Sequence, residues 1–135
     1  MGVVVDTPIW SLIVRREASR NGDRRLSLVL RNLAATGDAL LIGPVRQETL
    51  TAIADRARFE AARTALRGFD DEPLSSFDFE RAAEMSNACR AAGVAASGTD
   101  MLICAVAERL EAPIFTLDRD FEHYRDILGT ELYES

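Results

Sequence analysis

The chain has 135 residues, of which 47% are hydrophobic and 28% charged, with a formal net charge of −6. This composition predicts one globular domain, residues 1–135, and argues against both intrinsic disorder and a purely electrostatic grip on nucleic acid. All sixteen basic residues are arginines, so mechanisms that need a catalytic or phosphate-binding lysine are excluded.

The two cysteines and the N-terminus indicate the compartment. Cys89 and Cys104 fall in helical patterns and outside any Cys-x-x-Cys pair, which predicts buried free thiols rather than a zinc site or a disulfide. The apolar run of three valines near the N-terminus is too short for a signal peptide. No stretch approaches the roughly 20 apolar residues that span a bilayer. We therefore expect a cytoplasmic protein without a membrane segment.

The chain begins with a β-branched run. Val3–Val5 is uninterrupted, as in a central parallel strand buried on both faces, and it ends at Asp6. Thr7 is expected to cap the following helix, with Pro8 at its first position. That helix carries apolar residues at helical spacing and three arginines towards its end, and Asn21-Gly22 stops it.

The middle of the chain continues with alternating helix and strand patterns. We expect a helix from Asp23 to Gly37, a short buried strand over 39–42, and a helix from about Val45 that carries Glu48. A further helical pattern covers 55–66.

The last third follows the same rules. A loop over 68–76 precedes a helix capped by Asp78, and Thr99 is expected to cap a helix over 100–110. A third buried strand is predicted over 114–117, followed by a short helix and a tail or edge strand. The resulting order, β-α-α-β-α-α-α-α-β-α, predicts an α/β fold with a mostly parallel sheet.

Four acidic residues stand at special positions in this pattern. Asp6 and Asp118 each follow a buried strand, so both belong to the C-terminal edge of the sheet, where ligand sites form. Asp100 and Glu48 lie in the first turns of helices that start near the same edge. Alone, each fits a helix cap, a dipole-compensating acid or a solvated residue. Together they would repel one another without a cation, and hard oxygen ligands suit Mg²⁺ or Mn²⁺.

Other catalytic schemes fit the sequence poorly. His123 is the only histidine, and no G-x-S-x-G motif is present. A phosphoacceptor receiver domain needs paired acids after its first strand and a lysine after its last. Haloacid-dehalogenase-type phosphatases begin with D-x-D-x-T, whereas Asp6 is followed by Thr7 and Pro8.

Four segments resemble PIN-domain ribonucleases, especially toxins of the VapC type. They are VVVDTPIW, GPVRQETL, GVAASGTDMLICAVA and IFTLDRDFEHY, which together span nearly the whole chain in the family's order. The chain departs from the family at Gly43-Pro44, where many relatives have a small polar residue. It also departs at the tail, TELYES, which lacks the usual apolar closing strand.

The resemblance implies a three-layer α/β/α fold and metal-dependent hydrolysis of RNA phosphodiesters. It further implies homodimers and silencing by a cognate antitoxin. The apolar first helices offer a surface for either contact, although Trp10 on the first of them is expected to be core. The implied metal ligands and catalytic residues are Asp6, Glu48, Asp100 and Asp118, with Mg²⁺ or Mn²⁺ as cofactor. Supporting roles fall to Asp120, Thr7 and Thr116, and candidate RNA contacts are Arg15, Arg16, Arg46 and Arg119.

Two alternatives remain open on the sequence alone. The first is a catalytically degenerate PIN-like scaffold or binding protein. The second is a metal-dependent phosphatase or nuclease with a non-RNA substrate, because metal-held acids alone do not define a substrate.

Overall fold

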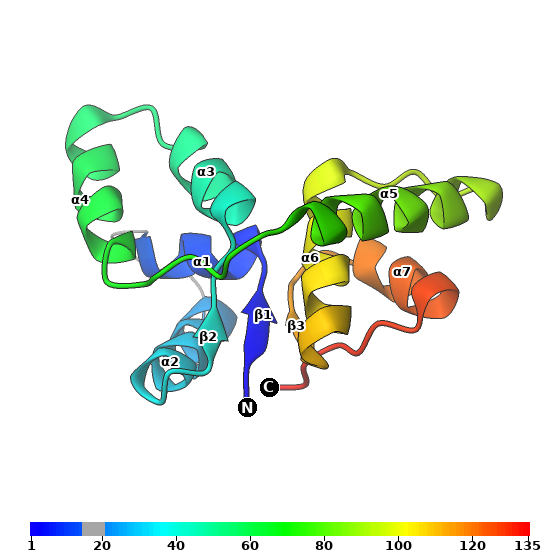
Figure 1. Ribbon diagram of the computed structural model, residues 1–135. Coiled ribbons are helices and arrows are strands. Elements are labelled where there is room, and N and C mark those ends of the chain that lie inside the picture. The colour runs from blue at the N-terminus through cyan, green and yellow to red at the C-terminus, as the bar shows by residue number, and fades with distance from the viewer. Residues whose placement is uncertain (15–20) are drawn as a thin grey trace.

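The computed structural model describes residues 1–14 and 21–135 (Figure 1). The predicted arginines Arg15 and Arg16 lie outside these residues. Strands and helices follow one another in the predicted order. The elements are β1 (Val3–Val5), α1 (Thr7–Val14), α2 (Asn21–Ala35), β2 (Ala39–Leu40), α3 (Gly43–Thr51), α4 (Arg56–Leu66), α5 (Ser76–Ala91), α6 (Gly98–Leu110), β3 (Ile114–Phe115) and α7 (Asp120–Leu128).

The sheet is parallel, with strand order β2-β1-β3. Val4 is the centre of the register, since it pairs with Leu40 on one side and Ile114 on the other. Isolated bridges from Leu41 to Asp71 and from Ile114 to Leu132 add further backbone pairing at the two edges. The C-terminal tail therefore lies beside β3 through a single bridge. The predicted α/β class and parallel sheet are confirmed.

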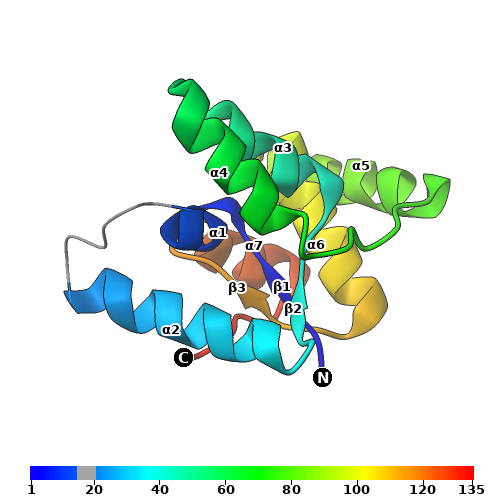
Figure 2. The same ribbon diagram turned by 90° about the vertical axis from the view of Figure 1, so that its left-hand side faces the viewer.

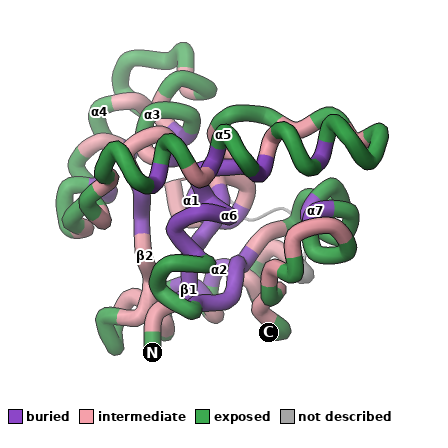
Figure 3. Tube along the Cα trace, turned by 45° about the vertical axis from the view of Figure 1, so that its right-hand side comes forward, coloured by how far each residue is buried: buried purple, intermediate pink, exposed green. Residues whose placement is uncertain are grey.

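Helices cover both sides of this sheet, giving the three-layer arrangement. Figures 1 and 2 show α1 and α2 on one side and α5, α6 and α7 on the other. Seven consecutive residues of α6, Met101–Ala107, are buried, because this helix packs on β1 and β3 while α5 covers its outer face. Figure 3 shows the same contrast: α6 and β1 are largely buried, whereas α4 and the outer side of α5 face solvent.

Trp10 belongs to the core, as predicted. Its side chain is fully buried, and its indole N–H donates to the carbonyl oxygen of Val5 at 3.0 Å. The ring packs edge-on against Phe69, with 4.8 Å between ring centroids. This contact ties the loop after α4 to the start of α1, and the indole hydrogen bond removes the cost of burying a polar N–H.

Three predicted helix caps are wrong by one turn or less. Ser97, not Thr99, caps α6: its hydroxyl accepts a hydrogen bond from the backbone N–H of Asp100 at 3.1 Å. Ser75, not Asp78, is the N-cap of α5, and Asp78 accepts from the Ser75 N–H. Thr7 lies within α1 rather than capping it. A capping serine followed three residues later by an acid explains the first two cases.

An ion pair between α5 and α6 secures the second helical layer. The Asp78 carboxylate is almost completely buried and accepts a hydrogen bond from Nε of Arg109 at 2.8 Å. Although burial acts to raise it, the pKa of Asp78 is held below its ordinary value by Arg109 and by the Ser75 N–H. Arg109 also donates to the Pro73 carbonyl oxygen, so one guanidinium joins α6, α5 and the loop between α4 and α5.

We expect Arg109→Met to lower the free energy of unfolding by about 2–3 kcal/mol at pH 7, because it leaves the Asp78 carboxylate buried without its partner. The loss of stability should narrow as the pH falls below the ordinary pKa of aspartate, about 4, because the stabilisation that the ion pair gives wild type is lost as Asp78 becomes protonated. Urea unfolding at several pH values measures it. The matched control is Arg90→Met, since Arg90 is exposed and donates to the side-chain oxygen of Asn87, a neutral partner on its own helix. Equal losses in the two variants would contradict a special role for the buried pair.

Candidate active site

An open pocket of about 660 Å³ lies at the C-terminal edge of the sheet. It is formed by the residues that follow β1, one face of α3, the start of α6 and the start of α7. The structure brings all four predicted acids to this pocket, together with Asp120 and Thr7. The lining residues are Asp6, Thr7, Pro8, Glu48, Ala95, Ala96, Ser97, Asp100, Asp118, Asp120 and Tyr124.

Asp6 is the most deeply buried of these acids, at 4% exposure. The backbone places it there, because its N–H donates to the carbonyl oxygen of Phe115 at 2.9 Å, immediately after β1. One carboxylate oxygen accepts from the Thr7 N–H at 2.8 Å, and the other from the Thr116 hydroxyl at 2.7 Å. Burial raises the pKa of Asp6 to about 6, and the nearby charges of Asp100 and Asp118 add to the effect.

Thr116 connects Asp6 to Asp118. Its hydroxyl donates to Asp6 and accepts from the backbone N–H of Asp118 at 3.0 Å. The strand ends at Phe115, two residues earlier than predicted, and the chain then turns so that Asp118 accepts from the Asp120 N–H at 2.9 Å. Asp118 and Asp120 are both exposed at the pocket's edge. The Thr116 hydroxyl therefore joins the carboxylate of Asp6 to the backbone of Asp118.

Asp100 enters the pocket from the first turn of α6. The Ser97 cap fixes its backbone, and its carboxylate accepts a hydrogen bond from the Tyr124 hydroxyl at 3.0 Å. Burial is the main cause of the raised pKa of Asp100, and the charges of Asp118 and Glu48 contribute. Burial and Asp100 together raise the pKa of the Tyr124 phenol as well, which keeps it a hydrogen-bond donor.

Ser97 and Tyr124 are pocket residues that the sequence analysis missed. The pattern Ser97-x-x-Asp100 is a capping signature and was available in the sequence. Tyr124 had no such signal, since its role depends on α7 packing beside the start of α6.

Glu48 reaches the pocket from the opposite wall. Its carboxylate accepts a hydrogen bond from the Thr7 hydroxyl at 3.2 Å, across 41 positions of sequence. Thr7 thus bonds Asp6 through its backbone and Glu48 through its side chain. Glu48 is exposed and lines the pocket.

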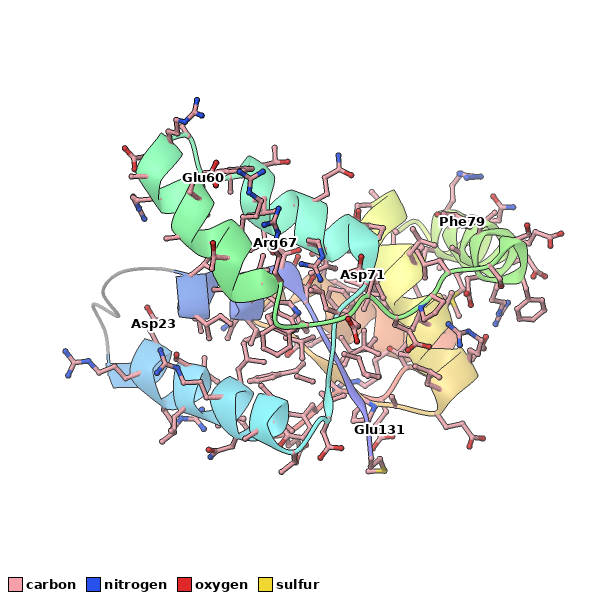
Figure 4. All side chains as sticks on the ribbon, turned by 60° about the vertical axis from the view of Figure 1, so that its left-hand side comes forward. Asp23, Glu60, Arg67, Asp71, Phe79 and Glu131 are labelled. Atoms are coloured by element: carbon pink, nitrogen blue, oxygen red, sulfur yellow. The ribbon has the colours of Figure 1, made fainter. Side chains whose placement is uncertain are left out.

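The predicted arginines divide into different environments. Arg119 is exposed at the start of α7, between Asp118 and Asp120. Arg46 is not among the pocket residues; it donates to the Asp71 carboxylate and to the carbonyl oxygens of Leu66 and Phe69. Asp71 lies in the loop after α4, labelled in Figure 4. These bonds give Arg46 a structural role in holding that loop against α3.

The chemistry of the donors fits a hard divalent cation. Every side-chain charge that lines the described pocket is a carboxylate, and no basic side chain lines it. Uncompensated carboxylates repel, and oxygen-only donors are those that Mg²⁺ and Mn²⁺ prefer. Within residues 1–14 and 21–135, however, no three His, Cys, Asp or Glu side chains are grouped so that they could hold an ion as they stand. The pocket supplies suitable donors, but not a closed coordination shell.

The fold and the site define a class: a three-layer α/β/α protein with clustered carboxylates at the C-terminal edge of a short parallel sheet. The PIN domain family model matches residues 3–127, and the chain belongs to the PIN domain family. The resemblance seen in the sequence is thereby confirmed at the level of the family.

Solved structures agree on the fold. The chain is similar to FitAcB from Neisseria gonorrhoeae, with a TM-score of 0.76 and 15% identity over 98% of this chain and 96% of that one. It is also similar to VapBC2 from Rickettsia felis, solved bound to a DNA fragment from their promoter. That match has a TM-score of 0.73 and 15% identity, over 98% of both chains. No curated protein sequence matches significantly. None of the described helices is long and apolar enough to cross a membrane.

We expect Asp6→Asn to stabilise the protein in metal-chelating buffer at pH 7.5, by up to about 3 kcal/mol. The pKa of Asp6 is raised to about 6 in the folded protein. The protonated side chain therefore contributes fully to the free energy of unfolding below about pH 4, and that contribution is lost as the pH rises through 6. Asparagine keeps the shape without the charge. Urea unfolding between pH 4 and 8 measures the difference, which should vanish at the acidic end.

The control for this substitution is Asp70→Asn, at an exposed aspartate away from the pocket. It should change the free energy of unfolding by less than about 0.5 kcal/mol at every pH. If Asp6→Asn were no more stable than wild type at pH 7.5, burial of the charged Asp6 carboxylate would not lower the free energy of unfolding.

Proposed function

We propose that this PIN domain is a metal-dependent endoribonuclease of the VapC type. The observation that supports it best is that four carboxylates line one pocket: that of Asp6 and three others that lie between 42 and 112 residues after it in the sequence. Structural acids are normally paired with arginines, as Asp78 is in this chain. A pocket that holds unpaired carboxylates at a stability cost indicates a functional demand.

Asp6, Glu48, Asp100 and Asp118 would hold one or two Mg²⁺ or Mn²⁺ ions, directly or through water. A bound divalent ion lowers the pKa of water and offsets charge on a phosphodiester, so the site needs no histidine base. Thr116 and Thr7 orient Asp6, since each bonds a different oxygen of its carboxylate. Tyr124 orients Asp100 in the same way. Asp120 stands at the exposed edge, where it supports the site without being fixed by a side-chain bond to the other acids.

RNA is the substrate that the resemblance to VapC-type toxins favours. An acidic pocket attracts a phosphodiester only with bound cations and nearby positive charge. Arg119 is exposed between two pocket acids and is suited to a phosphate contact. Arg15 and Arg16 remain candidates from outside the described residues. We do not propose Arg46 as an RNA contact, because its guanidinium donates to the Asp71 carboxylate and to the carbonyl oxygens of Leu66 and Phe69.

The same resemblance supports a cytoplasmic toxin that forms homodimers and is neutralised by a cognate antitoxin. The apolar first helices are the surface proposed for these contacts. Leu28 on α2 supports this, as a large hydrophobic side chain that is 58% exposed.

Cleavage of mixed RNA by the purified, partner-free protein tests the proposal. We expect cleavage with Mg²⁺ or Mn²⁺ and none with a chelator. Asp6→Asn and Asp100→Asn should each reduce the rate at least about 100-fold, because each removes a charge that would hold the ion. Asp70→Asn is the control and should cut like wild type.

A second readout does not depend on turnover. Mg²⁺ or Mn²⁺ should raise the melting temperature of wild type more than that of Asp6→Asn, since binding stabilises only the folded state. Unimpaired RNA cleavage by both Asn variants would show that the catalytic residues are misassigned. Cleavage of DNA or a phosphomonoester alone would favour the other substrate classes, and inertness towards every substrate would favour a scaffold.

A further inference from the structure

A second hollow adjoins the acidic pocket and differs from it in chemistry. It measures about 560 Å³ and shares two residues, Thr7 and Glu48, with the acidic pocket. Apart from Glu48, its lining is uncharged. The lining residues are Thr7, Pro44, Gln47, Glu48, Thr51, Ala52 and Thr99. We call this hollow the α3 groove.

One face of α3 makes most of this groove. Pro44, Gln47, Glu48 and Thr51 follow the spacing i, i+3, i+4 and i+7, which places their side chains along one stripe of the helix. Gln47 and Thr51 therefore lie on the same face of α3 as Glu48, which lines the acidic pocket. Thr99, next to Asp100 at the start of α6, contributes to the same hollow.

The lining chemistry suits a nucleobase and not a phosphate. The groove residues include no arginine, and Glu48 at its inner end repels an anion. The Gln47 amide both donates and accepts hydrogen bonds, and the threonine hydroxyls do so as well. Pro44 and Ala52 add apolar surface. RNA-binding proteins read unstacked bases with such side chains, and the volume is within the range of small-ligand sites.

We propose that the α3 groove is a base-recognition subsite of the nuclease, in which Gln47 and Thr51 read the base of a nucleotide adjoining the cleaved bond. This inference rests on the proposed function, because the acidic pocket has to hold the scissile phosphate. The shared residues Thr7 and Glu48 make the two hollows contiguous, so a single strand of RNA can place its phosphate in one and its neighbouring base in the other.

The chain beyond the groove offers a place for the next phosphate. A few residues after Ala52, α4 begins with Arg56, and Arg58 follows; both are exposed. The first turn of α4 contains no acidic residue. These arginines contribute phosphate affinity without reading sequence.

Cleavage of a random-sequence RNA pool, with the cut sites identified by sequencing, tests the subsite. Wild type should favour one base, or one pair of bases, at a position beside the cut. Gln47→Ala should relax that preference about tenfold, and Thr51→Val should alter it at the same position. Arg56→Ala should raise KM for all sequences alike and leave the preference unchanged.

The matched controls are Thr64→Val on the exposed side of α4 and Asn87→Ala on α5, neither of which lines the groove. Both should keep the wild-type preference and rate. If wild type cuts RNA but Gln47→Ala and Thr51→Val keep the wild-type base preference, the proposed subsite is wrong and the proposed nuclease function is unaffected. If wild type cuts no RNA with either metal, the proposed function fails and the subsite fails with it.

Discussion

The burial of one carboxylate, that of Asp6, is the constraint around which the site is built. β1 is the middle strand, so the residue after it emerges at the centre of the sheet edge with helices on both sides. Its carbonyl oxygen accepts the first backbone bonds of α1, from Ile9 and Trp10, while its N–H pairs with β3. Asp6 therefore joins the sheet, the first helix and the pocket, and its charged side chain has to be accommodated where all three meet.

Hydrogen bonds offset only part of the cost of that burial. The Thr7 N–H and the Thr116 hydroxyl satisfy both carboxylate oxygens, yet the pKa of Asp6 stays well above its ordinary value, because desolvation outweighs these bonds. Several carboxylates elsewhere in the molecule are paired with arginines. Arg46, Arg81 and Arg109 hold outer helices and loops through carboxylates and carbonyl oxygens. The acids of the pocket lack such partners among the side chains that line it. A site that keeps charges unpaired at a cost in stability is typical of the balance between stability and function.

The order of the elements could be predicted from the sequence, because each carries a local signal. Three consecutive valines, apolar residues at helical spacing and glycines near helix ends act through neighbouring residues. Boundaries were less secure: Ser97 and Ser75 replaced the expected caps, and β3 ended before Leu117, because the tertiary partners of a strand decide where its pairing stops. The four acids could be placed on one sheet edge, since parallel strands and the helices after them fix that edge by topology.

What the sequence by itself determined is the family, the parallel α/β order and the identity of the acids that could meet. These follow from local periodicity and from the direction of strands, which do not depend on distant contacts. Only the tertiary structure decided which side chains touch. In the folded chain Tyr124 donates to Asp100, and the Thr116 hydroxyl bonds both Asp6 and Asp118. Arg46 holds the loop after α4. The face of α3 that carries Glu48 also lines a groove that is otherwise uncharged. Such contacts join residues far apart in the chain, so they depend on how the helices pack and not on any local pattern.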